Sequence, residues 1–424
     1  MDEPFRTDTY DVIVAGAGLA GLAAGATAQR AGARTVVLDA HQGGGRATTD
    51  DLAGGFRFNQ GAHALYLGGP AARVLDTLGI TPRGAAPALG GGRGLVGGEL
   101  VELPLTPAGL LRSRLLGVRD KVRLARLLGR LPKLDPASVS GSSAAAWIAD
   151  QGLSPTGSLL LGALIRVSTY AADHEALSAG VAVGQLAAAL GGGVRYLDGG
   201  WRQLHEALAD GLEVRPRSPV ERIEDDGAAV VVQLAGGTQL RAGAVVVAVG
   251  SPAAAAALLP GEPAWGRPGT AVTAACLQLG LRRAAAVPFT LGLDEPLYCN
   301  THCPPAQLAP PGHVVVELLR YGATAAAADR ARLERLAAQV GVAHDEIVTQ
   351  RFLARMVVSS DCPGPADGGL AGRPAPDASG LDRVYLAGDW VGGEGFLADA
   401  SLASGATAGR AAADRRRPRV AGAA

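Results

Sequence analysis

The hydrophobic residues near the start of the chain form two short continuous runs with a small-residue segment between them. Residues 10–15 and 35–38 are almost uninterrupted apolar runs, which are typical of parallel strands buried on both faces. The alanine-rich stretch 22–30 between them predicts a helix. The pattern therefore predicts a strand–helix–strand unit, in which a glycine-rich turn from Gly16 to Gly21 joins the first strand to the helix.

This turn has the spacing Gly-x-Gly-x-x-Gly in the context that dinucleotide binding requires. Gly16 allows the tight turn, Gly18 lets a pyrophosphate approach the backbone, and Gly21 lets the helix pack on the strand. Leu19 and Ala20 stand at the start of the helix, where free N–H groups and the helix dipole favour a phosphate. The turn predicts a nucleotide cofactor without distinguishing NAD from FAD.

The second strand ends on a carboxylate, Asp39, which is followed by Ala40. A carboxylate at this position accepts hydrogen bonds from the ribose hydroxyls of a dinucleotide. The stretch 92–97 repeats the glycine spacing, but no strand precedes it and residues 98–104 alternate like a hairpin strand. We therefore reject a second nucleotide fold for NAD(P)H.

Three later segments decide between the two cofactors. Gly44-Gly45-Arg46 follows Asp39 closely, and Gly199-Gly200-Trp201 precedes a passage that leads through Val220 to the β-branched run 244–250. The third segment is a strand that ends in Gly388-Asp389, before a small-residue helix that starts near Ala400 and Ser401. That helix supplies a second N-terminus for a phosphate.

With these segments the chain resembles the superfamily that holds amine oxidases, phytoene desaturases and protoporphyrinogen oxidases, and it looks closest to phytoene desaturase-like oxidoreductases. The resemblance implies non-covalent FAD in a Rossmann-type, glutathione-reductase-like α/β domain that is interleaved with an α+β substrate domain. Two departures are that Asp39 replaces the commoner glutamate and that the following Gly-Gly pair lies one residue closer than usual. The FAD-contacting residues that the resemblance adds are Gly44, Gly45 and Arg46 by the pyrophosphate and flavin, Gly61 and Ala62 near the isoalloxazine ring, Val220 at the adenine, Gly388 and Asp389 at the ribityl phosphate, and Ala400 and Ser401 under the flavin.

The order of the segments predicts how the two domains share the chain. We expect residues 8–95, 190–265 and 370–415 to form the FAD-binding domain. Residues 96–189 and 266–369 are expected to form the substrate domain. A chain of 424 residues, 48% of them hydrophobic, is long enough for both cores.

The composition also bears on possible partners, metal sites and location. Lysine plus arginine and aspartate plus glutamate number 39 each, which argues against nucleic acid as a partner. The four cysteines lack paired metal-ligand spacing, so we expect reduced thiols and no metal site. Residues 1–9 have no apolar signal core, which favours a cytoplasmic location.

One segment, 110–133, is both strongly basic and rich in leucine. It predicts a basic amphipathic helix, or a pair of helices broken near Gly117. Such a helix suits contact with an anionic membrane surface, although the pattern favours a substrate-domain helix with a solvated arginine face.

The substrate is less closely defined than the cofactor. The superfamily's amine oxidases carry a lysine in the substrate-domain sheet, which the candidate strand 272–279 lacks, and no aromatic pair is evident after Asp389. We therefore expect hydride transfer from a mostly apolar small molecule to flavin N5, with oxygen or a quinone as the electron acceptor. A flavin amine oxidase and a redox-neutral FAD-dependent isomerase stay open as alternatives.

Four aromatic or imidazole side chains are candidates for the substrate side of the flavin. His63 and Tyr66 follow the segment that leads to the isoalloxazine ring, Tyr170 belongs to the substrate domain, and Trp390 comes directly after Asp389. His63 is as compatible with a structural role as with a catalytic one, and the same holds for Tyr170 in the core.

Overall fold

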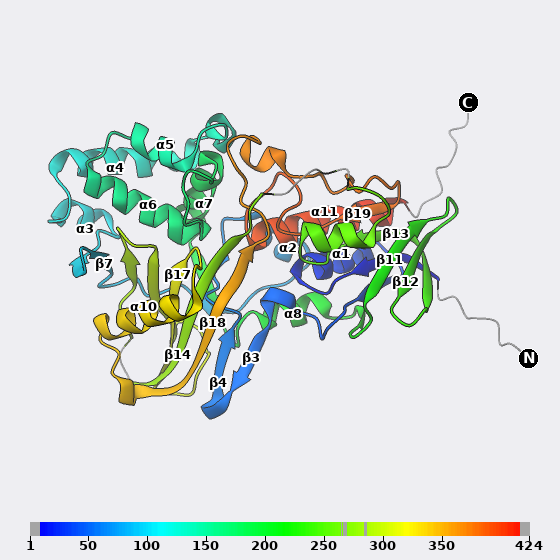
Figure 1. The fold of residues 1–424 in the computed structure, drawn as a ribbon, viewed down its shortest axis with the longest axis horizontal. Coiled ribbons are helices and arrows are strands. Elements are labelled where there is room, and N and C mark those ends of the chain that lie inside the picture. The colour runs from blue at the N-terminus through cyan, green and yellow to red at the C-terminus, as the bar shows by residue number, and fades with distance from the viewer. Residues whose placement is uncertain (1–8, 264, 266–268, 284–285, 416–424) are drawn as a thin grey trace, which may run out of the picture.

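The computed structural model describes residues 9–263, 265, 269–283 and 286–415. Positions 8, 264, 266–268 and 284–285, which the domain prediction included, lie outside this part of the chain. In the described part, two seven-stranded sheets occupy the two halves of the molecule, and the helices α3 to α7 gather beside the second sheet (Figure 1).

The first sheet has a parallel centre and an antiparallel edge. Its strands are β1 (Thr9–Ala15), β2 (Thr35–Leu38), β10 (Glu213–Arg215), β11 (Val220–Asp225), β12 (Val230–Leu234), β13 (Gln239–Val247) and β19 (Val384–Leu386). They follow the order β10-β2-β1-β13-β12-β11, with β19 parallel to β13. β1 runs parallel to both β2 and β13, so the predicted strand–helix–strand unit is confirmed.

Alternate side chains of this sheet enter two cores, as expected for strands buried on both faces. The helices on one face are α1 (Leu19–Arg30), α2 (Pro70–Thr77), α8 (Arg202–Ala209) and α11 (Ala398–Arg415), and α9 (Pro252–Leu258) packs on the other face. α1 and α11 approach closely because their contact consists of small residues. A Cβ atom on Gly405 would lie 2.2 Å from the oxygen of Ala20, and one on Gly409 would lie 2.2 Å from that of Ala24.

The second sheet is mostly antiparallel and has the order β18-β14-β17-β16-β15-β7-β8. Its strands are β7 (Arg93–Val96), β8 (Glu99–Glu102), β14 (Val272–Arg282), β15 (Thr290–Gly292), β16 (Leu297–Cys303), β17 (His313–Tyr321) and β18 (Ile347–Ser359). β7 and β8 form the predicted hairpin, so the second glycine motif lies in a strand–turn–strand unit and not in a strand–turn–helix unit. α10 (Ala326–Gln339) covers one face, and the other face turns toward α6 and Ala62.

The remaining helices and strands complete the fold. They are α3 (Pro107–Arg112), α4 (Val118–Arg130), α5 (Ala144–Asp150), α6 (Pro155–Thr169), α7 (Ala179–Gly192), the hairpin β3 (Thr49–Leu52) and β4 (Phe56–Asn59), and the small sheet of β5 (Leu65–Tyr66), β9 (Val194–Leu197) and β6 (Gly84–Ala85). The predicted helical pair is confirmed, since α4 begins directly after Gly117. No helix in the described ranges combines the length and apolar character needed to cross a membrane.

All strands of the first sheet come from the segments predicted to form the FAD-binding domain. The strands of the second sheet come from the predicted substrate segments, apart from the start of β7, because the predicted boundary at residue 95 falls inside that strand. The division into domains stays a prediction. The α/β architecture with a doubly covered parallel sheet is confirmed.

Candidate cofactor and active site

One large cavity, of about 1650 Å³, joins the two halves of the molecule. It begins at the carboxyl ends of β1 and β2, where open α/β sheets bind ligands, and continues between β18, α6 and α7. Pockets that hold a single small ligand usually measure about 300–1,000 Å³. The cavity therefore has room for a dinucleotide and a second molecule.

The glycine turn forms the first wall of the cavity, which Gly16, Gly18, Leu19 and Ala20 all line. Gly16 has φ +108°, and a Cβ atom there would lie 2.3 Å from the oxygen of Ala248. Gly18 has no neighbour within 4 Å on that side, and no side chain caps the N-terminus of α1. Gly21 lies behind the wall, where a Cβ atom would meet the oxygen of Gly16 at 1.8 Å.

The ribose side of this wall is formed by Asp39 and Ala40 at the end of β2, opposite Val220 at the start of β11. Asp39 accepts hydrogen bonds from Ala17 N and His41 N, both at 2.7 Å. Each carboxylate oxygen keeps a further acceptor position. Asp39 is thus held in place by the backbone while it still has capacity to bind hydroxyl groups.

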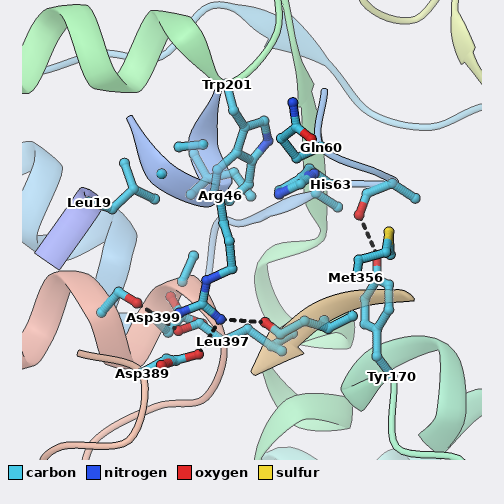
Figure 2. A pocket seen from close by; sticks show the side chains of 18 of the residues that line it. Leu19, Arg46, Gln60, His63, Tyr170, Trp201, Met356, Asp389, Leu397 and Asp399 are labelled. Atoms are coloured by element: carbon cyan, nitrogen blue, oxygen red, sulfur yellow. Dashed lines mark hydrogen bonds and ion pairs between the residues drawn. The ribbon is translucent and has the colours of Figure 1, made fainter. Parts of the chain in front are cut away.

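Arg46 reaches across the cavity from the Gly44-Gly45 turn to the end of the second phosphate-binding segment. Its Nη1 donates to Asp389 Oδ2 at 2.6 Å and to the oxygen of Val358 at 3.2 Å (Figure 2). Burial alone would raise the pKa of Asp389, but the Arg46 charge and the N–H of Ser360 outweigh it and lower that pKa. The arginine and the carboxylate are therefore both charged.

A second helix N-terminus stands beside this ion pair. Gly388 and Asp389 follow β19 and line the cavity, as does Ser401 in the first turn of α11, whereas Ala400 is buried behind it. The Oδ1 atom of Asp389 is buried and has no partner among the described residues. A buried acceptor without a donor carries a cost of about 1–3 kcal/mol, which a bound donor would remove.

The segment from Gly61 to His63 crosses the middle of the cavity. Ala62 and His63 line it, whereas Gly61, at φ +98°, lies underneath with Met356 Sδ 2.3 Å from the position of a Cβ atom. Nδ1 of His63 is 2.8 Å from the oxygen of Gly61, and its ring centroid is 4.7 Å from that of Trp201 (Figure 2). Burial lowers the pKa of His63, so the imidazole is neutral at pH 7.

The predicted tyrosines line the cavity with their rings and direct their hydroxyls into the protein. Tyr66 Oη donates to the oxygen of Ser168 and Tyr170 Oη to that of Ala62, each at 2.9 Å. Burial raises the pKa of both phenols, which stay protonated. Both hydroxyls are therefore engaged by main-chain oxygens.

Trp390 is the predicted substrate-side residue that the structure does not bring to the cavity. It is 2% exposed and packs in the core of the first sheet, with its ring centroid 5.6 Å from that of Trp265. The extended turn at Gly388 explains this placement, because the Trp390 indole lies directly against that glycine while Asp389 points to the opposite side.

Several cavity residues were missed from the sequence. Trp201, Tyr196, Tyr298, Leu397 and Asp399 all line it. The only sequence signal was the Gly-Gly-Trp motif at Trp201; the other four are brought in by tertiary packing. Leu397 stands out by its φ of +57°, which is rare for a residue other than glycine.

Asp399 is the second carboxyl group with an open oxygen. It is 3% exposed, and its Oδ1 accepts from Ala71 N at 2.8 Å while Oδ2 has no partner among the described residues. Burial raises its pKa to about 6. Asp399 caps the N-terminus of α2 and offers one free acceptor to the cavity.

These features fit a flavin dinucleotide. Two helix N-termini and the Gly16–Gly18 opening would hold the phosphates, Asp39 the ribose, and Asp389 with Arg46 the ribityl phosphate region. Among the described residues that line the cavity there is no cysteine, in agreement with non-covalent binding. Within the described ranges, no cluster of three or more metal-ligating side chains is present.

The likeness of the fold to solved structures is broad. Putrescine oxidase bound to putrescine shares 18% sequence identity (TM-score 0.72; 96% of this chain and 98% of that chain covered). Cyclohexylamine oxidase from Brevibacterium oxydans IH-35A shares 19% (TM-score 0.70; 96% and 99%). A protein assigned as a protoporphyrinogen oxidase from Exiguobacterium sp. 255-15 shares 17% (TM-score 0.66; 96% and 99%).

At these identities the solved structures establish the fold alone. No curated protein matches the sequence. The model of one protein family, described as flavin containing amine oxidoreductase, matches residues 19–413. The chain therefore belongs to the flavin containing amine oxidoreductase family, and it is an oxidoreductase with FAD as its cofactor.

Proposed function

We propose that this oxidoreductase takes a hydride equivalent from a mostly apolar small molecule and passes it to flavin N5. The observation that supports the proposal is the apolar character of the cavity wall between β18, α6 and α7, which we call the substrate end. Each tyrosine hydroxyl at the cavity forms a hydrogen bond with another protein group. The tyrosines are Tyr66, Tyr170, Tyr196 and Tyr298. Apolar side chains from α6, α7 and the loop before α3 complete this end: Leu105, Leu164, Val167, Leu186 and Leu190.

The protein residues place the substrate and keep the reacting atoms away from water. The cofactor, when bound, supplies the hydride acceptor, and the chain supplies position and electrostatics. His63 and Trp201 form one wall of the site in mutual ring contact. The neutral imidazole of His63 carries no charge that an apolar substrate would have to desolvate. We propose that His63, Tyr66 and Tyr170 contact the substrate.

The test is the anaerobic visible spectrum of the purified holoenzyme with a panel of isoprenoid or polyene lipids and a panel of primary and secondary amines. Bleaching of the oxidised-flavin band by an apolar compound is the expected result. Bleaching by amines alone would replace this proposal with the amine oxidase alternative. Absence of bleaching with both panels would favour the redox-neutral isomerase.

Asp399 favours the amine alternative over the isomerase. An ionised carboxyl group with a free oxygen suits an ammonium group, and two structures of similar fold are named putrescine oxidase and cyclohexylamine oxidase. The variant Asp399→Asn distinguishes an amine substrate from an uncharged substrate. It should weaken binding of an amine substrate about tenfold or more and leave binding of an uncharged substrate unchanged, because only the cation uses the charge.

We propose molecular oxygen or a quinone as the electron acceptor. The β7–β8 hairpin removes the one further sequence match to a nucleotide-binding turn, which leaves no motif for NAD(P). Stopped-flow mixing of the reduced enzyme with oxygen, a soluble quinone and NADP⁺ tests this. Rapid reoxidation by NADP⁺ would contradict the proposal.

We further propose that the enzyme is cytoplasmic and touches an anionic membrane surface through residues 110–133. Leu111 is 75% exposed and Val118 is 78% exposed, on two helices that also expose the arginines Arg112, Arg119, Arg126 and Arg130. Leu128 of α4 lines the cavity, so a membrane at this surface would lie near the substrate. Such a combination of apolar and basic groups is typical of interfacial helices.

The test is co-sedimentation with vesicles of phosphatidylcholine that contain or lack phosphatidylglycerol. The variant Leu111→Ser/Val118→Ser should lose binding to the anionic vesicles. The control Val348→Ser removes an exposed valine on β18, at 40% exposure, and should bind like the original protein. Equal binding of both variants would refute the membrane proposal without affecting the proposed chemistry.

A further inference from the structure

A row of four polar residues crosses the second sheet on the face that turns toward the cavity. The row runs over neighbouring strands in direct register and consists of Asn300 on β16, Glu317 on β17, Gln278 on β14 and Arg351 on β18. Glu317 and Asn300 are each 1% exposed, and Gln278 is fully buried. Buried polar groups of this kind are costly unless they serve a defined partner.

Hydrogen bonds link three of the four residues, Glu317, Gln278 and Arg351, into one unit. Gln278 Nε2 donates to Glu317 Oε1 at 2.8 Å, and Arg351 Nε donates to Gln278 Oε1 at 2.7 Å. The second carboxyl oxygen of Glu317 accepts from Cys276 Sγ at 3.2 Å. Glu317 therefore has both oxygens engaged, at the inner end of a chain that leads from Arg351.

This unit ends on the segment that carries His63. The main-chain oxygen of Asn59 accepts hydrogen bonds from Gln278 Nε2 at 3.1 Å, from Arg351 Nη2, and from Gly61 N at 2.8 Å. The side-chain oxygen of Asn59 accepts from Trp201 N at 2.9 Å. The polar row thus fixes both residues of the His63–Trp201 wall through one asparagine.

A glutamine at position 317 would keep the volume and one acceptor oxygen, whereas only a carboxyl group can also carry a negative charge there. We propose that Glu317 is a positioning residue that sets the electrostatic potential beneath the Asn59–His63 segment, so that its ionisation state tunes the reduction potential of the flavin. The inference rests on the proposed cofactor position, in which Gly61 and Ala62 pass near the isoalloxazine ring.

The surroundings of Glu317 agree with this role. Burial raises the pKa of Glu317 to about 7. The groups that face it from the packed strands are Cys276, Cys299, Tyr196 and Arg351. The pKa values of both thiols are raised by burial, as is that of the Tyr196 phenol, to about 12, so all three stay protonated near neutrality. Among these groups Glu317 is the one that changes charge between pH 6 and 8.

The sign of the effect follows from Coulomb's law. Reduction adds electron density to the flavin, and a carboxylate nearby opposes it, so ionised Glu317 lowers the reduction potential. Coupling is reciprocal, so reduction must in turn favour protonation of Glu317. We expect about a tenfold change in the ratio of oxidised to reduced flavin between the two states of Glu317, or about 30 mV for a two-electron couple.

The experiment is a dye-equilibrated titration of the holoenzyme from pH 5.5 to 8.5, which uses no substrate. Glu317→Gln should match the original protein at low pH and have the higher potential, by about 30 mV, at pH 8.5. Glu295→Gln, which removes a carboxylate that pairs with Arg332 at the far side of the sheet, is the matched control and should behave like the original protein. A Glu317→Gln curve that coincides with the original at all pH values would overturn the proposal.

A second measurement keeps the proposal testable if Glu317→Gln fails to fold. Redox-induced infrared difference spectra of the original protein at pH 7 should show the band of a protonated carboxyl group growing on reduction. Its absence would also overturn the proposal. The cofactor position has its own test, because Asp389→Ala should lose FAD; if that variant retains FAD with full occupancy, the cofactor placement has failed as well.

Discussion

Replacing Asp389 by asparagine tests the ion pair that joins the two cofactor-binding segments. The change keeps the volume and removes one charge. Asp389 is 1% exposed, and its Oδ2 accepts from Arg46 at 2.6 Å and from Ser360 N at 2.8 Å. Loss of one partner from a fully buried pair costs about 3–5 kcal/mol. The Arg46 side chain is 39% exposed toward the cavity, and because water there offsets part of the loss, we expect about 2–3 kcal/mol.

The pH dependence of this difference has a defined sign. The pKa of Asp389 is lower in the folded protein than in the unfolded chain, so its contribution is present above the unfolded value of about 3.9. The contribution is lost as the pH falls through the lower, folded value. The gap in stability between the original protein and Asp389→Asn should therefore be constant from pH 5 to 8 and should shrink only below about pH 4.

The assay is urea unfolding of the cofactor-free protein, monitored by circular dichroism and by tryptophan fluorescence. Unfolding curves that coincide for the two probes establish a single transition. Arg46→Met and the double variant complete a double-mutant cycle, in which we expect a coupling energy of about 1.5–2 kcal/mol. A coupling energy under about 0.5 kcal/mol would refute the claim that the pair contributes to stability.

Three further changes test other parts of the cavity. Asp39→Ala should lower FAD retention on desalting at least tenfold. The control Asp11→Ala removes a carboxylate that accepts from a main-chain N–H near the other end of β1, and it should retain FAD like the original protein. Equal retention by the two variants would show that Asp39 does not bind the ribose. His63→Ala should slow anaerobic flavin reduction by substrate at least tenfold with FAD still bound, and an unchanged rate would make His63 structural. Asp399→Asn should stabilise the cofactor-free protein by about 2–3 kcal/mol at pH 8 and have little effect at pH 4. The raised pKa makes ionisation of Asp399 increasingly destabilising from the unfolded value of about 3.9 up to about pH 6, above which the effect is complete; a loss of stability at pH 8 would contradict this.

Local features explain why much of the first sheet could be predicted from the sequence. Gly16 and Gly21 are recognisable because backbone geometry admits no other residue there, and Asp39 is recognisable because it ends a short apolar run. Such signals lie within a few residues of one another. They can therefore be recognised without knowing how the second sheet packs.

The substrate side depends on contacts between distant residues, and sequence reasoning was weaker there. Trp390 was expected at the cavity, but the turn at Gly388 sends neighbouring side chains to opposite faces. Glu317 could not be predicted from the sequence, because a single glutamate in an apolar strand has no local sequence signal. Its role is visible only once strand register places Gln278 and Arg351 beside it.

The close crossing of α1 and α11 has a consequence for biosynthesis. The helix that presents the glycine turn to FAD packs through Ala20 and Ala24 against Gly405 and Gly409, which the ribosome adds several hundred residues later. At about 5–20 residues per second, the first strand–helix unit waits on the order of 20–80 s for that partner. During this time the apolar face of α1 lacks this partner, so we expect the glycine turn to reach its final position only after α11 has been synthesised and has packed against it.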